Sequence, residues 1–198
     1  MGVIDLGPAA EQLGELVAGV TDEQLSRPTP CPAYSLRDLI AHVAGLPIAF
    51  GAAGRKERNA ITDTPPSPEA PPLAPDFRAA TPAALRELAA LWRDSGTWDG
   101  MTRIAGMDMP ADAVGVTLAD ELVVHGWDIA TALGRSYDAD PAALAAAQSF
   151  LDMVVSEDAV DGPSVAFGPP KPAPADASVL ERVVALAGRD ARWVPSGA

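Results

Sequence analysis

The stretch LADELVVHGWDIATAL, residues 118–133, decides the fold because its apolar residues recur at the spacing of one long amphipathic helix. Its apolar stripe consists of Leu118, Leu122, Ile129 and Leu133. His125 lies at the centre of that stripe, and Gly134 follows as a residue type that commonly ends helices. We therefore predict a helix that starts at about Ala113 or Thr117, ends at Leu133 and buries the face that carries His125.

Similar apolar spacing predicts further helices on both sides of this one. In chain order they are residues 8–20, a helix after Ser35 that Pro47 kinks or ends, a helix starting at Thr81 and Pro82, a helix opened by Asp140 and Pro141, and a short one capped by Ser178 and Glu181 and closed by Gly188. The spacing of Thr21 and Gln24 predicts a short capped turn. No segment shows convincing strand alternation, and residues 95–110 receive no assignment. We expect an all-α bundle of four or more long helices with an additional short C-terminal helical segment.

The length favours a single domain. The chain has 198 residues, of which 48% are hydrophobic, and this is enough to bury one sizeable core. The proline-rich residues 62–82 show almost no periodicity, which predicts a long surface connection inside the domain. We expect residues 1–198 to form one helical domain, with residues 163–198 as a C-terminal extension packed on the bundle.

Charge and cysteine content exclude several classes of function. The chain carries 27 acidic and 14 basic residues, a net charge of -13, which opposes binding to nucleic acid and to anionic membranes. No apolar run approaches the roughly 18 residues of a membrane span, so we expect a cytoplasmic protein. The single cysteine, Cys31, excludes an intrachain disulfide and a zinc site built from several cysteines.

The helix around His125 also carries two carboxylates on the same face. Glu121 precedes His125 by four residues and Asp128 follows it by three, so all three side chains point the same way. Buried carboxylates cost several kcal/mol unless a cation, a hydrogen-bond network or protonation compensates them. A divalent metal ion is one group that would supply the required positive charge.

The other histidine, His42, also faces inward, between Leu39 and Leu46 on its own helix. Two imidazoles and one carboxylate are a common ligand set for Zn²⁺ and similar metals, with positions left open for water or substrate. Asp38 lies one turn before His42, and Asp128 lies nearly one turn after His125. Each carboxylate is therefore a candidate to accept a hydrogen bond from the second nitrogen of the neighbouring imidazole.

The competing interpretation of these residues is an ordinary core. A single inward histidine is more often a hydrogen-bonded core residue than a metal ligand. Asp38 would then only complete the start of its helix, where acidic residues interact favourably with the helix dipole. Asp128 would pair with Arg135, and Cys31 would be a small buried thiol.

Four motifs provide independent support for a metal site. They are Thr29-Pro30-Cys31-Pro32, Leu39-Ile40-Ala41-His42, Glu121-Leu-Val-Val-His125-Gly126-Trp127-Asp128, and Gly188-Arg189-Asp190 with Trp193. In this order they resemble the actinobacterial DinB-like metal-binding proteins related to mycothiol-dependent maleylpyruvate isomerase, over nearly the whole chain. The resemblance implies a four-helix bundle with a divalent metal held by His42, Glu121 and His125. Tyr34 departs from the pattern, because relatives often carry tryptophan there.

The resemblance also implies a type of activity. It is an enzyme that activates the low-molecular-weight thiol mycothiol, as cosubstrate, for attack on a small electrophile, in an S-transferase or isomerase reaction. Zinc is the first choice of metal, and nickel, iron and manganese accept the same ligands. The alternatives are a hydrolase or iron oxygenase that uses the same ligands, and a non-catalytic ligand-binding protein that the metal stabilises. The sequence predicts neither the substrate nor the oligomeric state.

Overall fold

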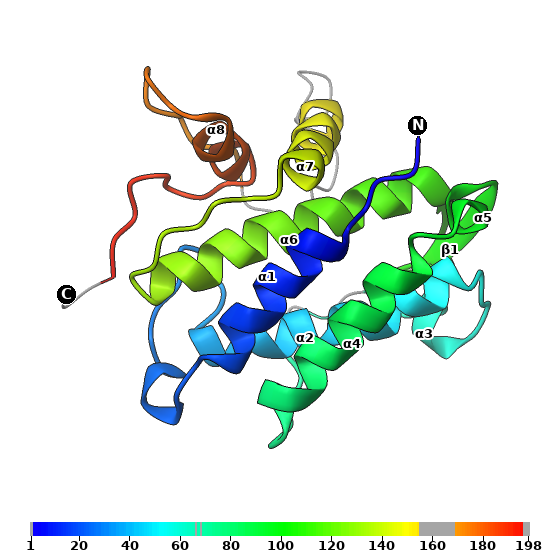
Figure 1. Cartoon of the computed structure of the whole chain (residues 1–198), viewed down its shortest axis with the longest axis horizontal. Coiled ribbons are helices and arrows are strands. Elements are labelled where there is room, and N and C mark those ends of the chain that lie inside the picture. The colour runs from blue at the N-terminus through cyan, green and yellow to red at the C-terminus, as the bar shows by residue number, and fades with distance from the viewer. Residues whose placement is uncertain (1, 66, 68, 155–168, 196–198) are drawn as a thin grey trace.

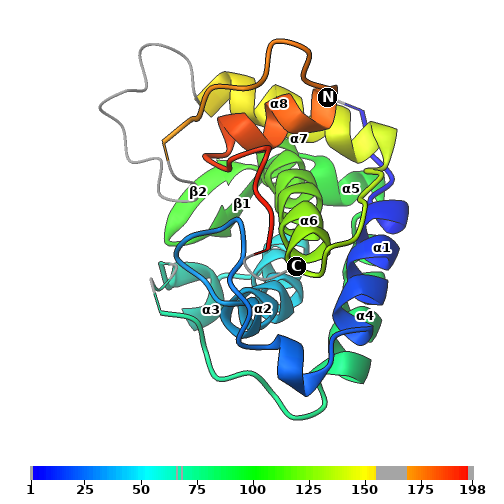
Figure 2. The ribbon, with the colours of Figure 1, turned by 90° about the vertical axis from the view of Figure 1, so that its left-hand side faces the viewer.

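Four long helices form a bundle in the computed structural model, which describes residues 2–65, 67, 69–154 and 169–195. They are α1 (Gly7–Ala18), α2 (Leu36–Gly54), α4 (Phe77–Leu91) and α6 (Ala111–Ala132). Helices α1 and α2 each contact both α4 and α6, which closes the bundle. Figures 1 and 2 show the four helices packed around a common core. The predicted all-α class and the bundle are confirmed.

The remaining elements lie at the ends and on one side of the bundle. They are η1 (Asp22–Gln24), α3 (Ala60–Asp63), α5 (Ser95–Trp98), β1 (Met101–Ile104), β2 (Met107–Pro110), α7 (Pro141–Val154) and α8 (Val179–Leu186). Helix α7 packs against α6, and α8 packs against both of these helices. The two C-terminal helices therefore cover the side of α6 that faces away from α2 and α4 (Figure 1).

Helix α2 begins where the sequence predicted and continues farther than expected. Ser35 and Asp38 form a reciprocal capping box at its start. The helix then runs through Pro47 to Gly54, so this proline does not end it. Pro47 lacks the N–H of one helical hydrogen bond, but the side chains of Leu46 and Phe50 are buried in the core around it. Their packing outweighs the lost hydrogen bond.

Helix α4 begins at Phe77, earlier than the predicted start at Thr81 and Pro82, so that boundary was wrong. Phe77 is buried in the core, and this draws the residues before Pro82 into the helix. The side chain of Arg78 also bonds to the bundle, since its Nε donates to the carbonyl of Val20 at 2.6 Å. The irregular connection before α4 is correspondingly shorter than residues 62–82.

Residues 95–110 contain a short hairpin that the sequence did not reveal. Strand β1 pairs with β2 in antiparallel register, with Thr102 opposite Met109. Ala105 and Gly106 join the strands with φ values of 53° and 79°, the left-handed conformation that tight hairpin turns require. The Thr102 hydroxyl donates to the carbonyl of Ala53 at 2.5 Å and ties the hairpin to α2. Each strand has 4 residues, too few for a recognisable alternation.

The helix ends near the site follow the predicted sequence signals. Helix α6 ends at Ala132, and Gly134 follows with a φ of 70°. Helix α8 starts with the Ser178 and Glu181 capping box, and Gly188 follows it with a φ of 81°.

Residues 163–168 and 196–198 of the expected C-terminal extension lie outside the described residues. The organisation of residues 1–198 as one domain stays a prediction.

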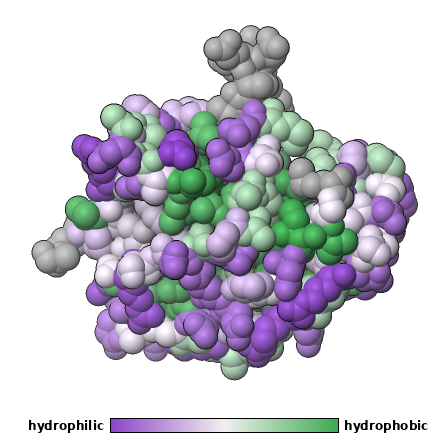
Figure 3. Space-filling model, turned by 45° about the horizontal axis from the view of Figure 1, so that its top comes forward, coloured by the Kyte–Doolittle hydropathy of each residue, from purple (hydrophilic) through white to green (hydrophobic). Residues whose placement is uncertain are grey.

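The surface over α7 and α8 mixes apolar and hydrophilic side chains (Figure 3). Met153 on α7 and Val179 on α8 are among the exposed apolar side chains. Among the described helices only α2 is long and apolar enough to cross a membrane by composition, and 56% of its apolar stretch is buried inside the bundle. A buried core helix passes the same test, so α2 is weak evidence for a membrane span.

Candidate metal centre

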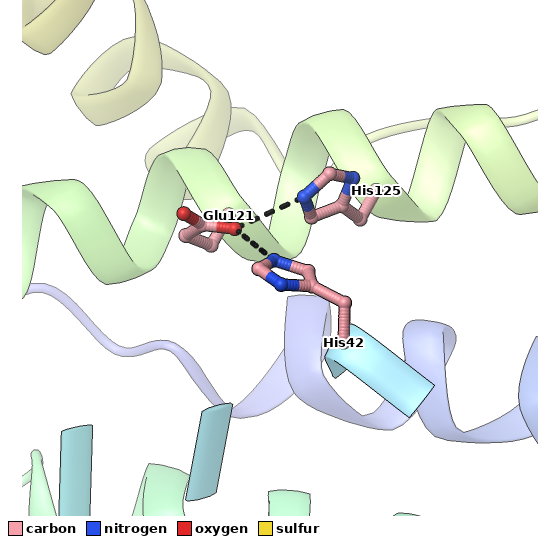
Figure 4. A group of neighbouring side chains, drawn as sticks. All are labelled: His42, Glu121 and His125. Atoms are coloured by element: carbon pink, nitrogen blue, oxygen red, sulfur yellow. Dashed lines mark hydrogen bonds and ion pairs between the residues drawn. The ribbon is translucent and has the colours of Figure 1, made fainter. Parts of the chain in front are cut away.

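Three side chains from two helices converge between α2 and α6 (Figure 4). Nε2 of His42 lies 3.1 Å from Oε2 of Glu121, and Nε2 of His125 lies 3.1 Å from the same oxygen. Glu121 and His125 are one turn apart on α6, whereas His42 comes from α2. The structure thus brings together the three residues that the sequence indicated as metal ligands.

The geometry and chemistry of this cluster are compatible with a bound divalent cation. One nitrogen or oxygen atom from each of His42, Glu121 and His125 lies within 4.8 Å of the other two. Bonds from Zn²⁺ to imidazole nitrogen and carboxylate oxygen are about 2.0–2.2 Å long, so three donors this close can share one ion. The side chains of Glu121 and His125 are 10% and 5% exposed, and that of His42 is 30% exposed. A ligand from solvent would therefore approach on the His42 side.

The charges within the cluster stabilise one another in the absence of metal. Burial alone would raise the pKa of Glu121, but its hydrogen bonds with His125 and His42 hold that pKa well below the usual value. Burial alone would lower the pKa of His125, but its hydrogen bonds with Asp128 and Glu121 raise it to about 9. Glu121 is therefore an anion and His125 a cation at neutral pH. A metal ion would take the place of the His125 proton as the positive charge beside Glu121.

Asp128 holds the second nitrogen of His125, as the sequence suggested. Its Oδ2 lies 3.0 Å from Nδ1 of His125 and 2.9 Å from Nη2 of Arg189. Arg189 and Asp128 are both buried, and Arg189 also donates to the carbonyl of Ala187 at 2.6 Å. A proton on Nδ1 that is donated to Asp128 leaves Nε2 directed toward Glu121, the arrangement expected of a metal-ligating histidine.

The partner of Asp128 differs from the one considered from sequence. Arg135 follows Asp128 closely on the chain, whereas Arg189 comes from the segment after α8. Nothing in the spacing of the residues connects Asp128 with Arg189. The signal that could have found the pair was the Gly188-Arg189-Asp190 motif, which places an arginine directly after the glycine that closes the last helix.

Asp38 takes the structural role that was the competing interpretation of this residue. Its Oδ2 accepts hydrogen bonds from the backbone N–H and the hydroxyl of Ser35, at 3.1 and 2.6 Å. These bonds turn the carboxylate toward the start of α2. The structure therefore brings Asp128, but not Asp38, to a candidate metal ligand.

Two further residues lie beside the cluster. The ring of Tyr34 stacks on that of His42, with 5.8 Å between the centroids and 28° between the planes. Cys31 is buried, and burial raises the pKa of its thiol, although the nearby Arg189 acts in the opposite direction. Cys31 is therefore a neutral thiol at physiological pH and a poor nucleophile.

A helical bundle in which two core helices bring a His/Glu/His cluster together is a class of fold that is compatible with a metal held between those helices. The chain belongs to the mycothiol maleylpyruvate isomerase N-terminal domain family, whose model matches residues 6–130. This range includes His42, Glu121, His125 and Asp128, and it ends before Arg189. The family membership confirms the resemblance read from the four motifs.

The chain also has relatives among curated proteins. An uncharacterized protein of Mycobacterium tuberculosis strain CDC 1551 is 30% identical over 190 residues, which cover 93% of this chain and 95% of the relative. An uncharacterized protein of strain H37Rv of the same species matches with the same identity and coverage. No solved structure shows significant similarity to the chain.

Proposed function

We propose that this protein is a metal-dependent enzyme that activates a low-molecular-weight thiol, mycothiol, for attack on a small electrophile. The observation that carries the proposal is the convergence of His42, Glu121 and His125 on one point between α2 and α6. Membership in a family named for a mycothiol-dependent isomerase supports the choice of thiol. The reaction is of the S-transferase or isomerase type.

Each residue of the cluster has a defined part in this proposal. His42, Glu121 and His125 would hold the metal, and Asp128 would keep Nε2 of His125 aimed at it. A divalent metal bound there would supply a positive charge that lowers the pKa of a thiol and stabilises the nucleophilic thiolate. Cys31, a buried neutral thiol, does not supply the nucleophile. The thiol therefore comes from a cosubstrate.

The requirement for a reduced small thiol has consequences for location and partners. Free thiols persist in the reducing cytosol and are oxidised outside it, so the proposed reaction belongs in the cytoplasm. The partners are the thiol and a small electrophile. The net charge of -13 makes nucleic acid and anionic membranes poor partners.

The first test is the metal content of the untagged protein, measured by mass spectrometry. We expect close to one equivalent of a divalent metal, zinc being our first choice, in the native chain. His42→Ala, His125→Ala and Glu121→Gln should lose it, while Glu15→Ala on the exposed face of α1 should keep it. If the native chain neither contains nor takes up a divalent metal, the cluster is structural and the proposal fails.

The second test is turnover by the metal-loaded protein. It should consume mycothiol in the presence of a panel of electrophiles, and the metal-free variants should not. Consumption of an electrophile at the same rate without mycothiol would indicate that water is the nucleophile, as in a hydrolase. No consumption of mycothiol with any electrophile would count against the thiol reaction while leaving the metal site intact.

A further inference from the structure

The two candidate histidine ligands are held in different ways. Nδ1 of His125 is bonded to Asp128, which Arg189 holds in turn. Among the residues that the structure describes, none forms a hydrogen bond with Nδ1 of His42. His42 is also the most exposed of the three candidate ligands, at 30% of its side chain. The plane of the His42 ring must therefore be fixed by a contact other than a hydrogen bond at Nδ1.

The carboxylate that the sequence indicated as the hydrogen-bond partner of the His42 imidazole is bonded elsewhere. Asp38 lies one turn before His42 on α2, but its carboxylate is engaged by the backbone N–H and hydroxyl of Ser35. Breaking those bonds would remove the cap of α2. The position of Asp38 is therefore set by the helix start and not by His42.

The ring of Tyr34 packs on the face of the His42 imidazole. Its centroid lies 5.8 Å from that of His42, and the two planes differ by 28°, an offset stack. Side chains on a helix lean toward its N-terminus, so the His42 imidazole leans toward the residues before α2, where Tyr34 lies. His42 also meets the ring of His125 nearly edge-on, with 4.8 Å between centroids and 78° between planes.

The backbone around Tyr34 is fixed independently of the site. The Thr29 hydroxyl lies 2.8 Å from the carbonyl oxygen of Tyr34 and 2.9 Å from that of Cys31. The N–H of Tyr34 donates to the Cys31 carbonyl at 3.1 Å, and Pro28 and Ser35 form an isolated β-bridge. This compact turn gives the Tyr34 ring a fixed support.

We propose that Tyr34 is the positioning residue for His42, and that its stacked ring fixes the imidazole plane as the carboxylate of Asp128 does for His125. The proposal rests on the metal site of the proposed function and adds a residue to it. The aromatic ring of Tyr34 fixes the imidazole plane, and its hydroxyl group is not required. Residues that orient metal-ligating side chains typically change metal affinity by about 10–100-fold when they are removed.

The test compares variants that keep an aromatic ring with variants that lose it. Tyr34→Phe and Tyr34→Trp should bind Zn²⁺ with an affinity within about threefold of the native chain, whereas Tyr34→Leu and Tyr34→Gln should bind it at least about tenfold more weakly. Affinity is measured by competition with a chromophoric chelator. Equal affinity in all four variants would overturn the proposal, and so would a loss in Tyr34→Phe as large as that in Tyr34→Leu.

A second measurement needs no metal and separates this inference from the proposed function. Nuclear magnetic resonance of the metal-free protein, with ¹⁵N-labelled histidine, reports the ring environment of His42 and of His125 separately. Tyr34→Leu should shift and broaden the His42 ring signals while leaving those of His125 in place, and Tyr34→Phe should leave both unchanged. If the native chain binds no metal, the proposed function fails but this comparison still decides the role of Tyr34. Unchanged His42 signals in Tyr34→Leu would overturn it.

Discussion

Nη2 of Arg189 donates a hydrogen bond of 2.9 Å to Oδ2 of Asp128, although the two residues lie 61 positions apart. Both side chains are buried, at 3% and 0% exposed. The same carboxylate oxygen of Asp128 holds Nδ1 of His125. The segment after α8 therefore supports the candidate metal centre through a chain of two hydrogen-bonded contacts.

Replacing Arg189 tests how strongly this chain contributes to stability. Arg189→Leu should lower the free energy of unfolding by about 3–5 kcal/mol, because it leaves the buried charge of Asp128 without its main partner. Urea denaturation of the metal-free protein measures the change. The matched control is Arg192→Leu, an exposed arginine close by, which should change stability by less than about 0.5 kcal/mol.

A double substitution separates loss of the ion pair from loss of packing. The double variant Asp128→Asn/Arg189→Leu no longer contains a buried carboxylate that has lost its arginine. Its loss of unfolding free energy should therefore be smaller than the sum of the losses in the two single variants. Strict additivity would show that the two residues do not interact energetically. In that case the contact seen between them would not explain the burial of either.

Asp120 provides a test of buried charge outside the cluster. It is fully buried on α6, and its two carboxylate oxygens have no hydrogen-bond partner among the residues that the structure describes. Burial, together with the charge of Glu121, raises the pKa of Asp120 well above 3.8, although His125 and Arg189 act in the opposite direction. The folded state therefore retains a proton that the unfolded chain loses near pH 4. Stability contributed by this group is present below that pH and is lost as the pH rises.

Asp120→Asn should consequently stabilise the protein at pH 7, by at least about 1 kcal/mol, and the gain should shrink as the pH falls to 4. Urea denaturation at a series of pH values gives the comparison. A destabilised Asp120→Asn at neutral pH would mean that the carboxylate is charged and compensated in the folded state.

The local part of the candidate site could be predicted from sequence. Glu121, His125 and Asp128 lie on one face of one helix, and helical periodicity alone places them together. The inward direction of His42 also followed from periodicity, but its meeting with Glu121 across two helices did not. That contact depends on how α2 packs against α6, and only the resemblance to a known family indicated it.

The remaining features depend on contacts that no short sequence window contains. The pairing of Arg189 with Asp128 joins residues 61 positions apart, and the stack of Tyr34 on His42 depends on the turn before α2. From sequence, Asp38 could either accept a hydrogen bond from His42 or complete the start of α2. Its hydrogen bonds to Ser35 show that it completes the helix start. The start of α4 at Phe77 was missed because burial of one aromatic side chain outweighed a local proline signal.

Two glycines inside helices make a matched pair for testing the packing of the bundle. A Cβ at Gly115 on α6 would overlap the rings of Trp98 and Trp92, whereas one at Gly45 on α2 would meet no atom within 4 Å. Gly115→Ala should therefore destabilise the protein by about 1–3 kcal/mol. Gly45→Ala should stabilise it by about 0.5–1 kcal/mol, since alanine favours a helix interior. Thermal or urea denaturation of the metal-free variants measures both, and equal effects would contradict the close packing at Gly115.

The pKa of His125 predicts that metal binding depends on pH. Hydrogen bonds to Asp128 and Glu121, acting against burial, raise that pKa to about 9 in the metal-free protein. At pH 7 the imidazole therefore carries a proton that a metal ion must displace from the ring. Binding should release about one proton, and affinity should rise about tenfold per pH unit until the pH reaches the pKa.

Calorimetric titration of the metal-free protein with Zn²⁺, in two buffers of different ionisation enthalpy, counts the protons released. Asp128→Asn removes a hydrogen bond that raises the His125 pKa, so this variant should release fewer protons at pH 7 than the native chain. The variant should bind metal less tightly at high pH, where the proton no longer competes, because it loses the group that orients the imidazole. Release of no proton by either protein would mean that His125 is already neutral before the metal binds, and that Asp128 acts on its orientation alone.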